Sequence, residues 1–252
     1  MKTIRHIPHA SRHIPKKYMD QFVLSSEDLD YEMLAMTDAF ADELFGTGTA
    51  DDLVFPVSRL LVDPERFVGD EETMNAVGMG AIYELTHKGK PLRRRLSDQE
   101  RKDLLQEFYY PHHRRLEDMA EIALSHHSGA LILDCHSYPT LAQPWESHKQ
   151  DARPEICIGT DPFHTPPYLT NAFTAAFSES GYTVDVNKPF RGTIVPTRFF
   201  NKEKKVSSIM IELRRNLYMD ELTGEKLDRF DKVRKDVWKA LAEAVEIVNR
   251  KC

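Results

Sequence analysis

The chain has 252 residues, of which 41% are hydrophobic and 29% charged, and its formal net charge at pH 7 is −6. The length fits one α/β domain as well as two small ones, and because no linker interrupts the chain we expect a single domain over residues 1–252. An acidic chain has no general attraction to nucleic acid, so we expect no nucleic-acid partner. No apolar run approaches the ~20 residues that cross a bilayer, so we expect no membrane partner. No signal peptide is evident, and we therefore expect a cytoplasmic protein.

The amino-terminal segment combines a strand with a helix. Residues 3–7 are predicted to form a strand, and the loop after it carries His9. Capping residues at 25–28 begin a run of apolar residues at nearly helical spacing that ends at Gly46. Asp38 lies inside this predicted helix, near its apolar face. An acid is unusual there unless it faces a partner or a metal, although it can also bond to local backbone or to an arginine.

Basic residues follow the next predicted strand. Residues 52–57 are typical of a strand, and Arg59 and Arg66 flank the short apolar run after it. A capping box at Ser97 then opens a long helix, which we expect to kink at Pro111 and to end before Gly129.

The most informative stretch is residues 130–139. Its first four residues are apolar, which indicates a buried strand of a parallel sheet. Ligands of open α/β sheets bind beyond the carboxyl ends of strands, so Asp134, His136 and Ser137 fall where a site is expected. The alternative is that Asp134 and Ser137 cap a turn and His136 is a core histidine.

The rest of the chain continues the alternation of strands and helices. We expect a loop over the site at 140–154, strands at 155–161, 182–186, 193–195 and 206–214, and helices at 166–180 and 227–248. Glu212 ends the buried strand 206–214, where an acid is costly unless it is used or paired, and Arg214 and Arg215 are the candidate partners. The order predicts an α/β fold with a mixed, largely parallel sheet between helices.

These residue types suit metal-assisted hydrolysis of an amide. Such a site needs about three nitrogen or oxygen ligands to zinc and a carboxylate outside that set to take a proton from water. His9, His136 and one carboxylate can supply the ligands, and Glu212 the base. Arginines such as Arg59 and Arg66 suit an oxyanion or a substrate carboxylate. The chain lacks G-x-S-x-G, P-loop and dinucleotide-binding motifs.

Six segments together resemble the N-formylglutamate amidohydrolase family, and they span nearly the whole chain in the family's order. They are residues 8–11, 58–66, 110–113, 133–137, 187–192 and 211–221. The chain is more distantly similar to zinc carboxypeptidases and aspartoacylases, whose fold is a mixed sheet between helices. The resemblance therefore implies a zinc-carboxypeptidase-like or phosphorylase-like fold.

The resemblance also implies roles for individual residues. His136 corresponds to a zinc ligand, Glu212 to the general base and Arg59 to the arginine that polarises the scissile carbonyl. Arg66 corresponds to the residue that holds the substrate carboxylate. Three further residues of the shared motifs are expected to contact the substrate: Ser137, Arg191 and His113.

Two departures separate this chain from the relatives. Their first two ligands come as H-x-x-E, whereas His9 is followed three residues later by Arg12, and we choose Asp38 as the carboxylate ligand. The family's D-L-N-R is D-P-E-R at residues 63–66. This change puts an acid beside Arg66, which is expected to bind the substrate carboxylate.

We therefore predict a zinc-dependent amidohydrolase with one Zn²⁺ per chain, held by His9, Asp38 and His136. Its expected partner is a small N-acylated acidic amino acid, with N-formyl-L-glutamate the leading substrate and histidine degradation the implied pathway. A carboxypeptidase-like or other N-acyl amino acid hydrolase is one alternative. A catalytically silent ligand-binding member of the fold is another.

Overall fold

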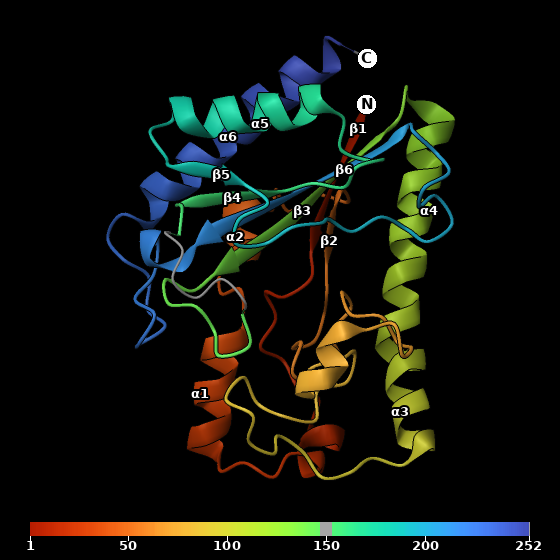
Figure 1. Cartoon of the computed structure of the whole chain (residues 1–252), viewed down its shortest axis with the longest axis vertical. Coiled ribbons are helices and arrows are strands. Elements are labelled where there is room, and N and C mark those ends of the chain that lie inside the picture. Colours follow the sequence, from red (N-terminus) through yellow and green to blue (C-terminus); the bar gives the residue numbers. More distant parts are fainter. Residues whose placement is uncertain (147–152, 252) are drawn as a thin grey trace.

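The structure, a computed structural model, describes residues 1–146 and 153–251. Its strands form one six-stranded sheet in the order β2-β1-β3-β6-β4-β5 (Figure 1). They are β1 (Lys2–Ile7), β2 (Asp52–Val54), β3 (Ala130–Tyr138), β4 (Ile156–Gly159), β5 (Val184–Val186) and β6 (Val206–Arg214). The first three and β6 run parallel, and β4 is antiparallel to β6. The predicted mixed, largely parallel sheet is confirmed.

Helices cover both faces of this sheet. They are α1 (Ser26–Met36), α2 (Ala41–Phe45), α3 (Asp98–Leu104), α4 (Tyr110–His126), α5 (Pro167–Glu179) and α6 (Phe230–Asn249), with short 3-10 helices η1 (Lys16–Gln21), η2 (Thr73–Val77) and η4 (Arg215–Leu217). The described residues include no helix with the length and apolar character needed to cross a membrane.

The two central strands form the core because they are buried on both sides. In β3, Leu131 and Leu133 join the cluster formed with α2, α5 and α6, whereas Ala130 and Ile132 join the cluster formed with α4. This alternation follows from the two-residue period of a strand. Sequence reasoning placed the strands at 130–139 and 206–214, and the structure confirms both.

The predicted helix from 25–28 to Gly46 is wrong in one respect that matters for the site. The helix ends at Met36 and a second one begins at Ala41. In the break, the Asp38 backbone N–H donates to His9 O, and Phe40 adopts a left-handed conformation with φ of 64°. The break frees Asp38 from the helix surface and ties it to the loop after β1.

Two other predictions need correction. Residues 193–195 form no strand, because the Ile194 N–H donates to Asp134 Oδ2 and its carbonyl accepts from Ser208 Oγ. The long helix predicted from Ser97 contains a π-helical turn, η3 (Leu105–Tyr109), just before Pro111. Proline has no N–H to give to a carbonyl one turn earlier. The predicted loop 140–154 lies partly outside the described residues.

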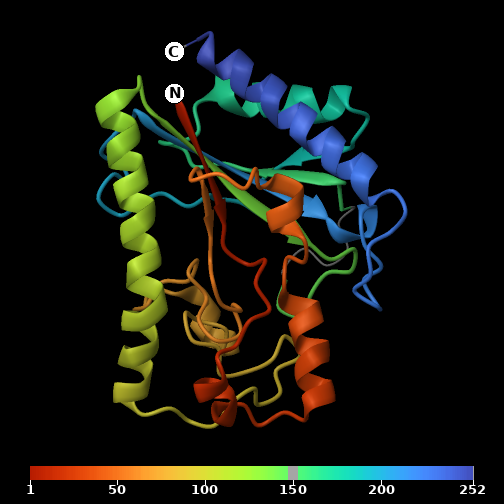
Figure 2. The same cartoon turned by 180° about the vertical axis from the view of Figure 1, so that it is seen from behind.

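A second, smaller group of elements lies beyond the carboxyl ends of the parallel strands. It consists of α1, η1 and the loops of residues 56–96, and it occupies the lower part of the molecule (Figure 2). Its own apolar residues pack among themselves and against the end of α3 and against η3. This group places residues 58–66 opposite the strand ends where ligands are expected.

Candidate active site

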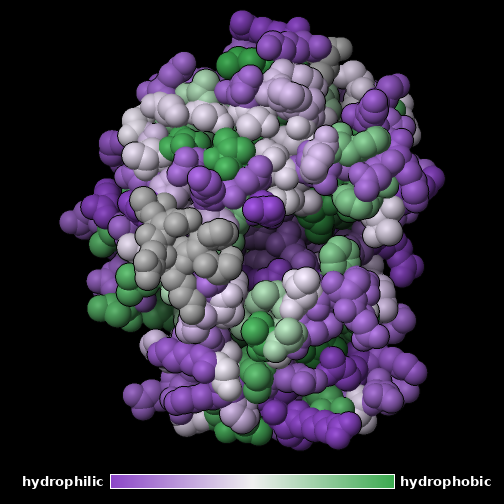
Figure 3. Space-filling model, viewed as in Figure 1, coloured by the Kyte–Doolittle hydropathy of each residue, from purple (hydrophilic) through white to green (hydrophobic). Residues whose placement is uncertain are grey.

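The register of the sheet brings four chemically active residues to one edge. β1 pairs with β3 so that His6 lies beside Asp134, and β3 pairs with β6 so that His136 lies beside Glu212. His9 follows two residues after the end of β1. Figure 3 shows a hollow with hydrophilic residues in the middle of the face that Figure 1 presents. The strand ends and loops therefore form a polar centre between the sheet and the lower group of elements.

His9 is buried with one ring nitrogen bonded and the other without a partner. Its Nε2 lies 2.9 Å from Asp63 Oδ1. Arg59 and the Tyr83 hydroxyl both donate to the other oxygen of this carboxylate, Asp63 Oδ2. The His9 Nδ1 atom has no hydrogen-bond partner and faces Asp38 Oδ2 at 3.6 Å. Because Asp63 accepts a hydrogen bond from Nε2–H, the lone pair of a neutral His9 is at Nδ1.

His136 has the same orientation. Its Nε2 lies 3.0 Å from Asp134 Oδ1, and its Nδ1 lies 3.2 Å from Asp38 Oδ2. Burial alone would lower the pKa of this imidazole, but the carboxylates of Glu65 and Asp134 raise it well above its ordinary value. Without a metal, His136 is therefore an imidazolium held among carboxylates.

Asp38 connects the two histidines to a buried arginine. Its Oδ2 faces both Nδ1 atoms, while Oδ1 accepts from Arg215 Nη2 at 3.0 Å. Burial would raise the pKa of Asp38, but the hydrogen bond of His136 and the electrostatic effect of His9 and Arg215 hold it well below its ordinary value. Asp38 is thus an anion at neutral pH, with one oxygen neutralised by Arg215 and the other turned to the histidines.

Glu65 is a second carboxylate in this centre, which sequence reasoning treated only as a departure from the family motif. Its Oε2 lies 3.0 Å from His136 Nε2, and its Oε1 lies 3.5 Å from His6 Nδ1. Ligand atoms of His9, Glu65 and His136 lie within 4.8 Å of one another, as do those of His6, Glu65 and Asp134. The signal for Glu65 in the sequence was its place between two predicted site arginines.

Glu212 is buried beside His136 and lacks an ion pair among the described residues. Its Oε2 has no hydrogen-bond partner. The two candidate partners are engaged elsewhere, since Arg214 donates to Asn216 Oδ1 and Arg215 to Asp38. Burial raises the pKa of Glu212 to about 8, an effect that the nearby His136 opposes. A carboxyl group with this pKa can exchange a proton near neutral pH.

Comparison with known proteins identifies the family. The family model described as N-formylglutamate amidohydrolase matches residues 1–219, which include every predicted site residue and end before α6. The chain belongs to the N-formylglutamate amidohydrolase family. It is therefore a hydrolase that acts on an amide bond.

Relatives of known name and structure agree with this family. An N-formylglutamate deformylase of Pseudomonas aeruginosa is 27% identical over 200 residues, covering 77% of this chain and 72% of its own. One from Pseudomonas putida is 25% identical over 225 residues, covering 85% and 80%. The crystal structure of an N-formylglutamate amidohydrolase from Ralstonia eutropha JMP134 superposes with a TM-score of 0.80 at 21% identity, covering 99% of this chain and 95% of its own. This last match supports the fold.

Three further predicted site residues of this amidohydrolase family member, Arg59, Arg66 and His113, differ from one another in their hydrogen-bond partners. Arg59 is held by Asp63 and Tyr83, whereas the Arg66 Nε is buried without a hydrogen-bond partner. His113 Nε2 bonds to the carbonyl of Pro64 and so supports the loop that carries Glu65.

The last two predicted substrate contacts differ in exposure. Ser137 is buried, and its Oγ accepts from Arg215 Nε at 3.2 Å. Arg191 is exposed, and within residues 1–146 and 153–251 no hydrogen bond or ion pair joins it to this centre. Arg215, which sequence reasoning considered only as a partner of Glu212, therefore contacts both Ser137 and Asp38.

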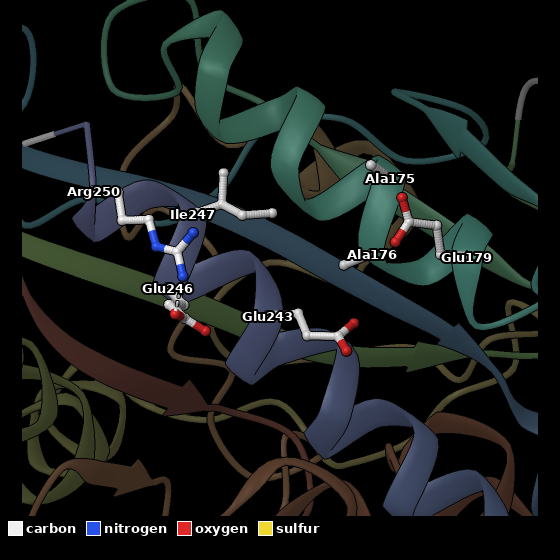
Figure 4. A pocket seen from close by; sticks show the side chains of 7 residues that line it. All are labelled: Ala175, Ala176, Glu179, Glu243, Glu246, Ile247 and Arg250. Atoms are coloured by element: carbon white, nitrogen blue, oxygen red, sulfur yellow. Dashed lines mark hydrogen bonds and ion pairs between the residues drawn. The ribbon is translucent and has the colours of Figure 1, made fainter.

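A separate hollow lies on the α5 and α6 side of the sheet. It is lined by Ala175, Ala176, Glu179, Glu243, Glu246, Ile247 and Arg250 (Figure 4). Arg250 pairs with Glu246 of the same helix. None of the family's motif residues lies there, so this hollow is not the active site.

Proposed function

We propose that this chain is a metal-dependent amidohydrolase that removes the N-acyl group of a small acidic amino acid, as one domain over residues 1–252. N-formyl-L-glutamate is the leading substrate, because two relatives carry the name N-formylglutamate deformylase. The observation that carries the proposal is the buried, unpartnered Nδ1 of His9, which faces the same Asp38 oxygen as Nδ1 of His136.

His9, Asp38 and His136 are the proposed metal ligands, with one Zn²⁺ at this site. Zinc takes imidazole nitrogen and carboxylate oxygen, and histidine ligands commonly give their other N–H to a carboxylate. His9 does so with Asp63, and His136 with Asp134. A zinc ion held here would act as a Lewis acid and lower the pKa of water.

Asp38 is preferred to Glu65 as the carboxylate of this triad for a geometric reason. Asp38 Oδ2 lies near the Nδ1 atoms of both histidines. Glu65 Oε2 lies farther from His9 Nδ1, at 3.9 Å, and it faces His136 at Nε2, the nitrogen that also bonds to Asp134. An ion at the Nδ1 atoms would therefore have Asp38 as its nearest carboxylate.

Glu212 is the proposed general base. It lies beside His136 in the sheet and has an oxygen free of hydrogen bonds. In its ionised form it takes a proton from the attacking water, and it then delivers that proton to the leaving nitrogen, so the amine departs neutral. The carboxylate remains outside the metal triad and can change its protonation without loss of a ligand.

The arginines are the proposed contacts of the substrate. The guanidinium of Arg66, whose Nε lacks a partner, is suited to a substrate carboxylate, which an arginine binds bidentately. Arg59, fixed by Asp63, would polarise the scissile carbonyl. Ser137, His113 and Arg191 stay predictions as further substrate contacts.

The test is amine release from a panel of N-acyl amino acids by the zinc-loaded protein. N-formyl-L-glutamate is expected to be the best substrate, and N-formyl-L-glutamine, which lacks the side-chain charge, is the matched control. Equal turnover of the two compounds would remove the requirement for an acidic side chain. A folded, zinc-loaded protein that releases no amine from any of these compounds would support the silent-binding alternative.

A further inference from the structure

The carboxylates of this centre differ in what neutralises them. Asp38 pairs with Arg215 and Asp63 pairs with Arg59. In contrast, the ion-pair partners of Glu65 and Asp134 in the described ranges 1–146 and 153–251 are all histidines. Buried anions are costly unless they are neutralised, so this pair requires protons on those histidines or a further cation.

We propose that His6, Glu65 and Asp134 form a second divalent-metal site, and that Glu65 bridges it to the first site through the oxygen that faces His9 Nδ1. His6 Nδ1 lies 2.9 Å from Asp134 Oδ1 and 3.5 Å from Glu65 Oε1. The other Glu65 oxygen lies 3.0 Å from His136 Nε2 and 3.9 Å from His9 Nδ1. The two oxygens of Glu65 thus face two different sets of histidines.

The backbone fixes Glu65 in this orientation. Its N–H donates to Asp63 Oδ1 at 2.9 Å, and the preceding carbonyl, Pro64 O, is bonded by His113. The side chain of Glu65 is only 15% exposed. A carboxylate held this firmly against three histidines is preorganised for ions rather than for solvent.

His6 has a hydrogen-bond partner, His112, that can fix its tautomer for metal binding. Its Nε2 lies 2.8 Å from Nε2 of His112, which is buried against Phe55. When the His6 Nε2–H donates to His112, the lone pair of His6 is at Nδ1 and faces the two carboxylates. Without an ion, Nδ1–H donates to Asp134 at 2.9 Å, so a second ion must displace this proton.

A shared carboxylate between two ions ~3.5–4 Å apart is typical of two-metal hydrolytic sites. Zinc suits both sets of ligands, which contain only imidazole and carboxylate. This inference rests on the proposed function for the first site. It adds that the departure from the family motif at Glu65 creates a metal ligand next to that site.

The experiment is metal stoichiometry measured by elemental analysis after stripping with a chelator and dialysis against Zn²⁺. The wild type is expected to hold two ions per chain, and His6→Asn one. Glu65→Gln is a second, independent variant that should also lose the second ion. His87→Gln alters a buried histidine paired with Glu32 away from this centre, and it should keep both ions.

A spectroscopic readout tests the bridge itself. Two Mn²⁺ ions that share a carboxylate are magnetically coupled, so the wild type loaded with Mn²⁺ should give a coupled signal in electron paramagnetic resonance. His6→Asn should give the signal of isolated Mn²⁺. Melting curves of each variant establish that it is folded.

The outcomes separate this inference from the proposed function. One ion per chain in both wild type and His6→Asn would overturn the second site and leave the first intact. No ion in the wild type would overturn both. Two uncoupled ions that both persist in His6→Asn and Glu65→Gln would show binding elsewhere and would also overturn the second site.

Discussion

At the scale of single residues, the centre depends on how its histidines are oriented. His9 and His136 each bond one carboxylate through Nε2, which turns Nδ1 of both rings toward Asp38. A neutral imidazole oriented in this way is a ligand without further rearrangement, because the outer carboxylate fixes its tautomer. When no ion is bound, the surrounding carboxylates stabilise the protonated form of His136, so an ion must displace that proton.

The first prediction concerns His136. The substitution His136→Ala removes one of three proposed ligands and should weaken zinc binding by more than ~100-fold, since loss of even an outer partner costs ~10–100-fold. Competition with a chelator measures the affinity. The control is His87→Ala, which removes another buried histidine and should leave the affinity unchanged. Unchanged affinity in folded His136→Ala would exclude it as a ligand.

A second prediction separates chemistry from metal binding at Glu212. Glu212→Gln preserves the size of a buried side chain that has no ion pair among the described residues. Turnover should fall by at least ~100-fold, the lower range for a general base, while zinc content stays at the wild-type level. Wild-type turnover in this variant would show that another group takes the proton.

The raised pKa of Glu212 also predicts how stability depends on pH. Burial raises the pKa to about 8, from an ordinary value of 4.5. A group whose pKa is raised on folding contributes stability below its unfolded pKa and loses it as the pH rises through the folded one. Metal-free Glu212→Gln should therefore gain ~4 kcal/mol over the wild type as the pH rises from 5 to 9, because each unit of pKa shift is worth ~1.4 kcal/mol. Urea unfolding measures this difference, and a difference independent of pH would contradict the assignment.

At the scale of elements, short irregular segments place the charged groups. The break between α1 and α2 delivers Asp38, and η4, directly after β6, delivers Arg215 to the same carboxylate. Both segments lie beside regular elements that the sequence predicted correctly. The site is thus built where helical or strand geometry ends, because a side chain there can turn across the sheet edge.

The ion pair of η4 gives a fourth prediction. Arg215→Met leaves the Asp38 anion buried without its arginine, which should lower the stability of the metal-free protein by ~3–5 kcal/mol. Zinc should restore part of this loss, because the ion then becomes the cation next to Asp38. Arg214→Met is the neighbouring control, since Arg214 bonds to Asn216 and the Arg153 carbonyl instead. Melting with and without zinc tests both, and an equal metal effect in the two variants would contradict this role.

At the scale of the whole molecule, the sequence predicted the layers better than the contacts. Buried apolar runs gave β3 and β6, and the helical spacing gave α5 and α6, because these patterns depend on local periodicity alone. The helix break at Thr37 was missed because nothing local contradicts a helix there. It is stabilised by the distant His9 carbonyl.

The site was predictable only in part, because several of its contacts join residues that are far apart in the sequence. Strand ends point to a common edge, which identified His9, His136 and Glu212 as candidates that the structure brings together. The pairing of Asp38 with Arg215, 177 residues apart, depends on tertiary structure. The inward orientation of Glu65 depends on the His113 contact to Pro64, which no pattern in the sequence reports.

The central claim is that His9 Nδ1, Asp38 Oδ2 and His136 Nδ1 bind one metal ion. A crystal structure of the zinc-loaded protein, with anomalous scattering recorded at the zinc edge, tests it most directly. A zinc peak is expected at ~2.0–2.2 Å from all three atoms. A zinc peak bound through the Nε2 atoms, or one with the Asp38 carboxylate more than about 4 Å away, would contradict it, because a carboxylate ligand lies at about half that distance.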